Sequence, residues 1–232
     1  MARLLSGVWA DSVGIRRPPG PYFIKKGYQA RAKPEYTQEL DDDVIWQPDV
    51  YAKAAELGAD APTARIIDVG CGDGRKLAAL HPGFEIVGID YGPNLARCRD
   101  LYPFGTWLEH DLESEGPLPL SAEELGGSVI VCADVVEHLV NPERMLRAFA
   151  AALETSYALV ISTPERNLHR GARHMGPPPN PAHVREWSIA EFSSFLAAQG
   201  LRNGRIGLTR SNDLYPLQDT ILAVLDPEAR YP

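Results

Sequence analysis

The stretch Ile66–Gly74, with the sequence IIDVGCGDG, decides how the rest of the chain is interpreted. An apolar run rich in β-branched residues ends in an acid and is followed by glycines at positions 70, 72 and 74. Residues 75–80 then read as the first turns of a helix. Glycine is needed where the backbone turns with positive φ or where a ligand must touch it. The pattern predicts a strand, a tight glycine turn and a helix whose N-terminal N–H groups face an electronegative ligand.

The spacing of the glycines separates two kinds of nucleotide site. A dinucleotide fold uses G-x-G-x-x-G, whereas the third glycine here comes one residue early, and Asp68 precedes the first glycine by two. This D-x-G-x-G-x-G run resembles motif I of the class I S-adenosylmethionine-dependent methyltransferases. In that family the loop wraps the methionine and ribose parts of the cofactor. A glycine turn without a ligand is the plain alternative.

Composition suits one domain with a sizeable core. The chain has 232 residues, 44% of them hydrophobic and 23% charged, as is normal for a globular protein. A net charge of −8 argues against a broad phosphate-binding surface, so a nucleic-acid partner is not expected. The sequence has no apolar run of membrane-spanning length and no signal-peptide pattern. Three cysteines without metal or redox spacing fit a reducing cytoplasm.

The N-terminal part divides into two segments. Residues 1–27, rich in Gly, Pro and basic residues, are expected to form an arm that lacks regular structure at least in part, and its aromatic residues would also suit a homodimer contact. Residues 28–60 are expected to form a helical cover, with one helix starting near Asp41–Asp43 and a clearer one over Asp49–Leu57. In the resembled family such helices cover the cofactor. The methyltransferase domain would then occupy residues 28–232.

Apolar runs and helical segments alternate through the rest of the chain. Strands are expected at 66–69, 84–90, 105–109, 128–133, 157–162, about 202–209 and 218–225. Helices are expected at 93–99, 121–125, 143–153 and 188–199. The resemblance, which covers about residues 40–226, implies an α/β fold. It is a Rossmann-like seven-stranded sheet of order 3-2-1-4-5-7-6, with strand 7 antiparallel and helices on both faces.

Acids at the ends of successive strands extend the predicted cofactor site. Asp90 ends the second strand, where a carboxylate can accept hydrogen bonds from ribose hydroxyls. Asp111 follows the third strand, and the resemblance implies that it holds the adenine amino group, although a plain turn aspartate is the alternative. The full predicted cofactor set is Asp68, Gly70, Cys71, Gly72, Asp90, Tyr91, Asp111, Leu112 and Ala133.

Polar residues after the fourth and fifth strands are the candidates for chemistry. Ligands of an open α/β sheet lie beyond the carboxyl ends of the strands. Methyl transfer from a sulfonium is a direct displacement that depends on alignment and exclusion of water. An amine acceptor need only be neutral, whereas a hydroxyl needs a base or a metal. The side chains at this edge should therefore indicate the class of acceptor.

The pattern Asp134-x-x-Glu137-His138, with the later His183-x-x-Glu186-Trp187, carries a second resemblance. It is similar to the metal site of small-RNA 3′-terminal ribose methyltransferases, and ubiquinone-pathway O-methyltransferases share its first half. On a helical turn, Asp134 would share a face with Glu137 and His138.

The second resemblance implies a divalent metal ion held by Asp134, Glu137, His138 and His183, with Asp134 in place of the family's glutamate. Two imidazoles and two carboxylates suit Mn²⁺, Fe²⁺, Co²⁺ or Zn²⁺, and Mg²⁺ is also compatible. The metal-free alternative makes Glu137 structural and leaves His138 or His183 as the general base.

A long segment, residues 164–187, is the predicted substrate loop, because loops of this length in compact domains are usually functional. It holds four arginines and three histidines: Arg166, His169, Arg170, Arg173, His174, His183 and Arg185. This composition predicts a small-molecule acceptor that is anionic or sugar-linked.

Together these observations predict a cytoplasmic S-adenosylmethionine-dependent O-methyltransferase of a hydroxyl on a small molecule or sugar, with catalytic roles for Glu137, His138 and His183. The alternatives are N-methylation of a small molecule, methylation of an RNA-terminal ribose and, in a different class, a nucleotide-dependent oxidoreductase. A module that keeps the fold but has lost the chemistry is disfavoured by the intact acids Asp68, Asp90 and Asp111.

Overall fold

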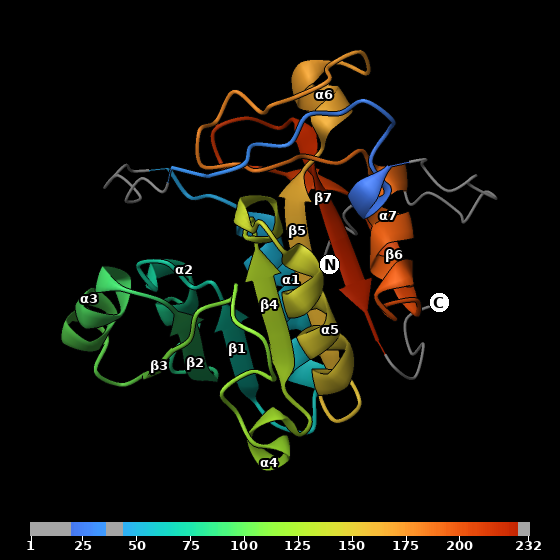
Figure 1. The fold of residues 1–232 in the computed structure, drawn as a ribbon. Helices are drawn as coiled ribbons and strands as arrows, with labels where there is room; N and C mark the ends of the chain where they lie inside the picture. The colour runs from blue at the N-terminus through green and yellow to red at the C-terminus, as the bar shows by residue number, and fades with distance from the viewer. Residues whose placement is uncertain (1–19, 36–43, 227–232) are drawn as a thin grey trace.

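Seven strands form one sheet in the computed structural model, which describes residues 20–35 and 44–226 (Figure 1). The spatial order is β3-β2-β1-β4-β5-β7-β6. The strands are β1 Arg65–Val69, β2 Glu85–Asp90, β3 Thr106–Glu109, β4 Val129–Ala133, β5 Ala158–Pro164, β6 Gly204–Arg210 and β7 Gln218–Leu225. The first five strands pair in parallel, and β7 runs antiparallel to both β5 and β6. The predicted fold class, strand order and orientation of strand 7 are confirmed.

Helices cover both faces of this sheet and close two apolar layers. The helices are α1 Pro48–Asp60, α2 Arg75–Ala78, α3 Pro93–Leu101, α4 Ala122–Leu125, α5 Pro142–Ala152, α6 Arg166–Arg170 and α7 Ile189–Ala198, with short 3-10 turns η1 Pro21–Phe23 and η2 Val136–His138. One layer packs α1, α2 and α3 on the sheet, and the other packs α5 and α7. Every residue of β4 is buried, as expected for a central parallel strand.

The helices agree with the predicted ones in most places. Ser188 and Glu191 form the predicted capping box of α7, in which each side chain accepts a hydrogen bond from the backbone N–H of the other residue. Helix α5 places Met145, Leu146 and Phe149 on one buried face. The predicted helix over Asp49–Leu57 is α1, whereas the helix start predicted at Asp41–Asp43 lies outside the described residues. Helix α6 was not predicted, because the sequence of residues 164–187 was interpreted as a loop.

The segment 20–35 lies along the loop 164–187 at the carboxyl ends of β4 and β5, where both cross the top of the sheet in Figure 1. Backbone N–H groups of the segment donate to carbonyls of the loop, from Gln29 to Met175 at 2.8 Å and from Arg31 to Val184 at 2.8 Å. The first described residues therefore form a second layer over the predicted substrate loop. No helix of the described residues is long and apolar enough to span a membrane.

Candidate active site

The glycine loop after β1 adopts the backbone that its sequence predicts. Gly70, Gly72 and Gly74 have φ of 82°, 56° and 72°, in the region that favours glycine. A Cβ atom on Gly70 would lie 2.4 Å from Cγ2 of Val135, so a side chain has no room there. The loop brings its backbone close to the end of β4, as a ligand-binding turn requires.

Two of the predicted cofactor acids make hydrogen bonds at the base of this loop. Asp90 accepts hydrogen bonds from the N–H groups of Gly72 and Tyr91, both at 2.6 Å. Asp68 is fully buried and accepts a hydrogen bond from the Tyr51 hydroxyl of α1 at 2.7 Å. Burial raises the pKa of Asp90, although the two backbone hydrogen bonds oppose that shift. Asp90 thus holds the glycine loop in shape, whereas Asp68 ties the end of β1 to α1.

The remaining predicted cofactor residues lie along the same edge of the sheet. Cys71 is buried in the glycine loop, and Ala133 is buried at the end of β4. Tyr91 is 62% exposed just beyond β2. Asp111 is exposed, and its carboxylate accepts a hydrogen bond from the Glu113 N–H at 2.9 Å, which is the geometry of a turn aspartate. Its adenine contact stays a prediction, as does that of the half-buried Leu112.

Glu137, His138 and His183 come together beyond β4 and β5. Among the described residues they form a group that could hold a metal ion, with one ligand atom from each within 4.8 Å of the others. The two imidazoles meet edge to face, with ring centroids 4.8 Å apart. Glu137 and His138 come from η2, and His183 comes from the loop after β5, so the predicted approach of two separate segments is observed.

Asp134, the fourth predicted ligand, lies outside this group. Its φ is 53°, so it precedes η2 in a left-handed conformation and does not share a helical face with Glu137 and His138. Its carboxylate accepts hydrogen bonds from the Ser162 hydroxyl at 2.8 Å and from the Gln47 side-chain amide. The helical-face argument for Asp134 was wrong because it assumed helical dihedrals directly after the strand.

Glu137 is the best indication that a cation fits this place. Its side chain is fully buried, and its Oε2 accepts a hydrogen bond from the Thr163 hydroxyl at 2.9 Å. Its Oε1 has no hydrogen-bond partner among the described residues. Burial, together with the nearby Asp134 charge, raises the pKa of Glu137 well above its usual value. A divalent cation would satisfy the orphaned oxygen and favour the ionised carboxylate.

The imidazoles are held by hydrogen bonds at Nδ1. His138 Nδ1 lies 3.0 Å from the Ala182 carbonyl, and His183 Nδ1 lies 2.8 Å from Oε1 of Glu186. Burial, together with the neighbouring His183, lowers the pKa of His138 to about 4. His138 is therefore neutral at physiological pH, as either a metal ligand or a base requires.

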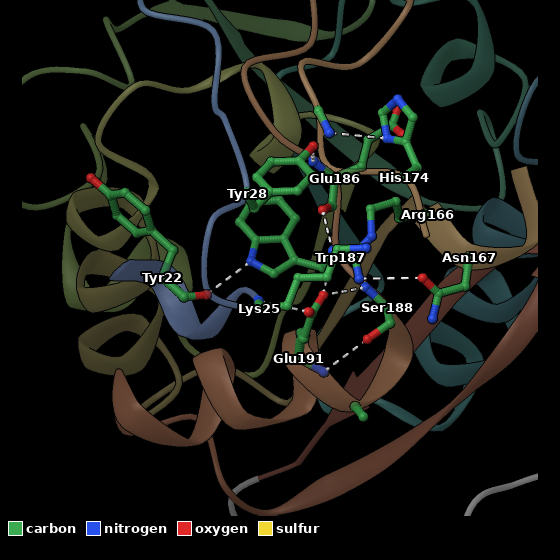
Figure 2. Close-up of polar contacts among 12 residues, drawn as sticks. Tyr22, Lys25, Tyr28, Arg166, Asn167, His174, Glu186, Trp187, Ser188 and Glu191 are labelled. Carbon is green, nitrogen blue, oxygen red and sulfur yellow. Dashed lines mark hydrogen bonds and ion pairs between the residues drawn. The ribbon is translucent and has the colours of Figure 1, made fainter. Parts of the chain in front are cut away.

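Two arginines of the predicted substrate loop are buried and make hydrogen bonds within the protein. Arg166 is buried and donates from Nη1 to Oε2 of Glu191 at 2.5 Å (Figure 2). Arg185 is buried as well, and it donates to the carbonyls of Leu139 and Val140 at 3.0 Å each. The predicted contact of the loop's basic side chains with an anionic acceptor stays a prediction, and this buried pair does not support it, because composition does not reveal burial.

Tyr28 and Arg31, which belong to the segment 20–35, make hydrogen bonds to the loop 164–187 close to His183. Figure 2 places Tyr28 beside Glu186, whose N–H donates to the Tyr28 hydroxyl at 3.1 Å. Arg31 donates from Nε to the His183 carbonyl at 3.2 Å and from Nη2 to the Pro178 carbonyl at 2.7 Å. Neither contact follows from sequence, since the partners lie about 150 positions apart in segments without periodicity.

Comparisons with known proteins identify a methyltransferase domain in this chain. A methyltransferase domain family matches residues 45–205. The ubiquinone biosynthesis O-methyltransferase of Xanthomonas campestris pv. campestris (strain B100) is 31% identical over 107 residues, 45% of each chain. That of Xanthomonas oryzae pv. oryzae (strain PXO99A) is 31% identical over 111 residues, 46% of each chain. The chain therefore matches just under half the length of these relatives.

Solved structures share the fold at low identity. The methyltransferase domain of bacterial CtHen1-CN has a TM-score of 0.54 and 19% identity, over 78% of this chain and 98% of that one. Magnesium protoporphyrin IX methyltransferase from Synechocystis PCC 6803, solved with bound S-adenosylhomocysteine, has a TM-score of 0.53 and 19% identity, over 78% and 83%. With its glycine loop, strand order and matched domain, the chain belongs to the class I S-adenosylmethionine-dependent methyltransferase family.

Proposed function

We propose that the protein transfers a methyl group from S-adenosylmethionine to a hydroxyl of a small molecule or sugar. The observation that carries the proposal is the convergence of Glu137, His138 and His183 within 4.8 Å at the ligand edge of the sheet. An amine acceptor would need no such group, whereas a hydroxyl must lose its proton as the new bond forms. Relatives named as O-methyltransferases support the same class of acceptor.

S-adenosylmethionine, when bound, supplies an electrophilic methyl group on a positively charged sulfur. The glycine loop and Asp90 would hold the cofactor at the ends of β1 and β2, and an acceptor hydroxyl would lie beyond β4. The imidazole of His183 or His138 would take the hydroxyl proton as the oxygen accepts the methyl group and S-adenosylhomocysteine leaves. Segment 20–35 lies over the loop 164–187 and would help to keep water from this place.

A divalent ion fits the same residues. Glu137, His138 and His183 would hold it, with Asp134 as the nearest further carboxylate. Such an ion would lower the pKa of a hydroxyl bound to it. The orphaned Oε1 of Glu137 favours this version over the metal-free one. The bound ion and the general base are two forms of one proposal, because both use the same imidazoles.

The acceptor is a small molecule in this proposal, and the protein works in a reducing cytoplasm. The net charge of −8 disfavours a nucleic-acid partner, and the buried Arg166 and Arg185 reduce the case for an anionic acceptor. All three cysteines are buried free thiols, which suits that compartment.

The test measures S-adenosylhomocysteine formation with a catechol, a monophenol, a nucleotide sugar and a primary amine. We expect product from at least one hydroxyl compound, loss of activity with chelator, and recovery with added Mn²⁺ or Co²⁺. Turnover that chelator does not change would select the general-base form. Methylation of the amine alone would overturn the proposal and favour N-methylation.

A further inference from the structure

The two ring nitrogens of His183 have partners of opposite kind. Nδ1 lies 2.8 Å from Oε1 of Glu186, and Nε2 lies 3.0 Å from the Nδ2 atom of Asn180. A carboxylate accepts, so Nδ1 carries the hydrogen, and an amide nitrogen donates, so Nε2 offers its lone pair. The orientation of the amide has an independent support, because Oδ1 of Asn180 accepts a hydrogen bond from the Ala182 N–H at 3.0 Å.

Glu186 is built to stay in place and to stay charged. It is fully buried, and Arg166 donates to its carbonyl at 3.1 Å. Its Oε2 lies 3.5 Å from Nε of Arg170. The buried carboxylate of Glu186 is therefore held between the His183 ring and the Arg170 guanidinium.

We propose that Glu186 is the positioning residue of the site, which holds His183 with its lone pair on Nε2. The amide of Asn180 occupies the place on Nε2 that the acceptor proton or a metal ion takes. Asn180 is exposed and can swing aside, whereas the buried Glu186 cannot. The inference rests on the proposed function, since it assigns a use to Nε2. The hydrogen bond at one nitrogen sets which nitrogen is available at the other.

The test is the NMR signal of the His183 ring in the full chain, free of cofactor and acceptor, at neutral pH. Proteins with ¹⁵N-labelled histidine are compared, and the His183 signals are assigned by their absence in His183→Gln. The wild type should show a protected hydrogen on Nδ1 and none on Nε2. In Glu186→Gln that hydrogen should shift upfield and exchange about tenfold faster, because a charged acceptor is replaced by a neutral one. In Glu186→Ala its signal should disappear.

Two further variants complete the design. Asn180→Ala should move the Nε2 signal toward that of an unbonded ring nitrogen and leave the Nδ1 hydrogen in place. Asp219→Asn is the matched control, since it changes the carboxylate that lies 3.3 Å from His169 of the same loop. It should leave the His183 signals unchanged.

A wild-type His183 with its hydrogen on Nε2, or an Nδ1 signal unaffected by Glu186→Gln, would overturn the inference. An Nε2 signal unchanged in Asn180→Ala would overturn the assignment of Asn180. If Glu186→Ala does not fold, Glu186→Gln decides alone. The spectra need no turnover, so they stand whether or not a hydroxyl acceptor is found. A wild type without O-methylation would count against the proposed function only.

Discussion

The carboxylate of Asp90 and the backbone N–H of Gly72 lie 2.6 Å apart, which ties the end of β2 to the glycine loop of β1. A residue predicted to bind the ribose therefore also holds the loop that would wrap the rest of the cofactor. The second oxygen accepts the Tyr91 N–H at 2.6 Å, so the carboxylate orientation is fixed before any ligand arrives. Preorganisation of this kind reduces the ordering cost of binding.

Replacing Asp90 should weaken cofactor binding through both contacts. Hydrogen bonds to a charged group contribute about 1.5–3 kcal/mol, so Asp90→Ala should lose roughly tenfold or more in affinity for S-adenosylhomocysteine. Asp90→Asn can accept only one of the two backbone N–H groups at its single oxygen, and it should fall between wild type and Ala. Calorimetric titration measures both variants. Wild-type affinity in a folded Asp90→Ala would remove this residue from the cofactor site.

His183→Ala should separate catalysis from cofactor binding. A lost general base costs about 10²-fold or more in kcat, while the glycine loop that binds the cofactor is untouched. His174→Ala is the matched control, because His174 belongs to the same loop and its Nδ1 accepts the Gly176 N–H at 3.3 Å. Steady-state kinetics on the acceptor found by screening gives the comparison. Near wild-type kcat in His183→Ala would contradict both the metal and the base form.

A buried and an exposed arginine of the loop 164–187 should contribute differently to the free energy of unfolding. Arg185 donates to two carbonyls and lies 3.9 Å from the Tyr22 ring centroid, so Arg185→Ala should lower the free energy of unfolding by about 2–4 kcal/mol. Arg173 is exposed, and Arg173→Ala should leave stability within about 0.5 kcal/mol. Urea unfolding distinguishes them. Equal stability of the two variants would show that the buried contacts of Arg185 contribute little.

The contribution of Asp49 to the free energy of unfolding should disappear in acid. Its carboxylate accepts two hydrogen bonds from Arg210, at 2.9 and 2.5 Å, and the first cause of its lowered pKa is that contact. Because the folded pKa lies below the unfolded one, the contribution is present above the ordinary value of 3.8 and is lost as pH falls through the folded pKa.

Asp49→Asn should therefore lower the free energy of unfolding by about 1–2 kcal/mol at neutral pH, allowing for solvent screening at Arg210. The difference from wild type should shrink as the pH falls below 3.8. Asp60→Asn changes an exposed acid at the other end of α1 and serves as the control. Urea unfolding at a series of pH values gives the comparison, and a difference that grows in acid would contradict the assignment.

The fold could be predicted because its signals are local. Each apolar run ends at an acid or a turn, and the glycine loop after Val69 carries the family resemblance that implies the strand order. Family membership also removes the oxidoreductase alternative. What sequence could not supply depends on dihedrals and on distant contacts. Asp134 leaves the metal group because of a positive φ, and helix α6 spans only five residues, too few for a periodic pattern.

The site was only partly predictable for the same reason. His138 and His183 follow neighbouring strands, so their meeting could be expected from topology. The roles of Glu186 and Asn180 could not, because both are fixed by hydrogen bonds within an irregular loop. The sequence does place an acid, Glu186, three positions after His183, but this spacing alone indicates only the family pattern and not a hydrogen bond to the His183 ring.

The layer formed by residues 20–35 has a consequence for synthesis. Tyr28 and Glu186 are 158 positions apart, and at about 5–20 residues per second the ribosome needs roughly 8 to 32 seconds to make the intervening chain. During that interval the early segment has been made and its partners in the loop 164–187 have not. The strands β1 to β5 can assemble first, and the loop 164–187 with His183 joins them afterwards. A pause in translation before residue 164 would therefore leave a nascent chain that has its glycine loop, Glu137 and His138 but lacks His183 and the loop that carries it.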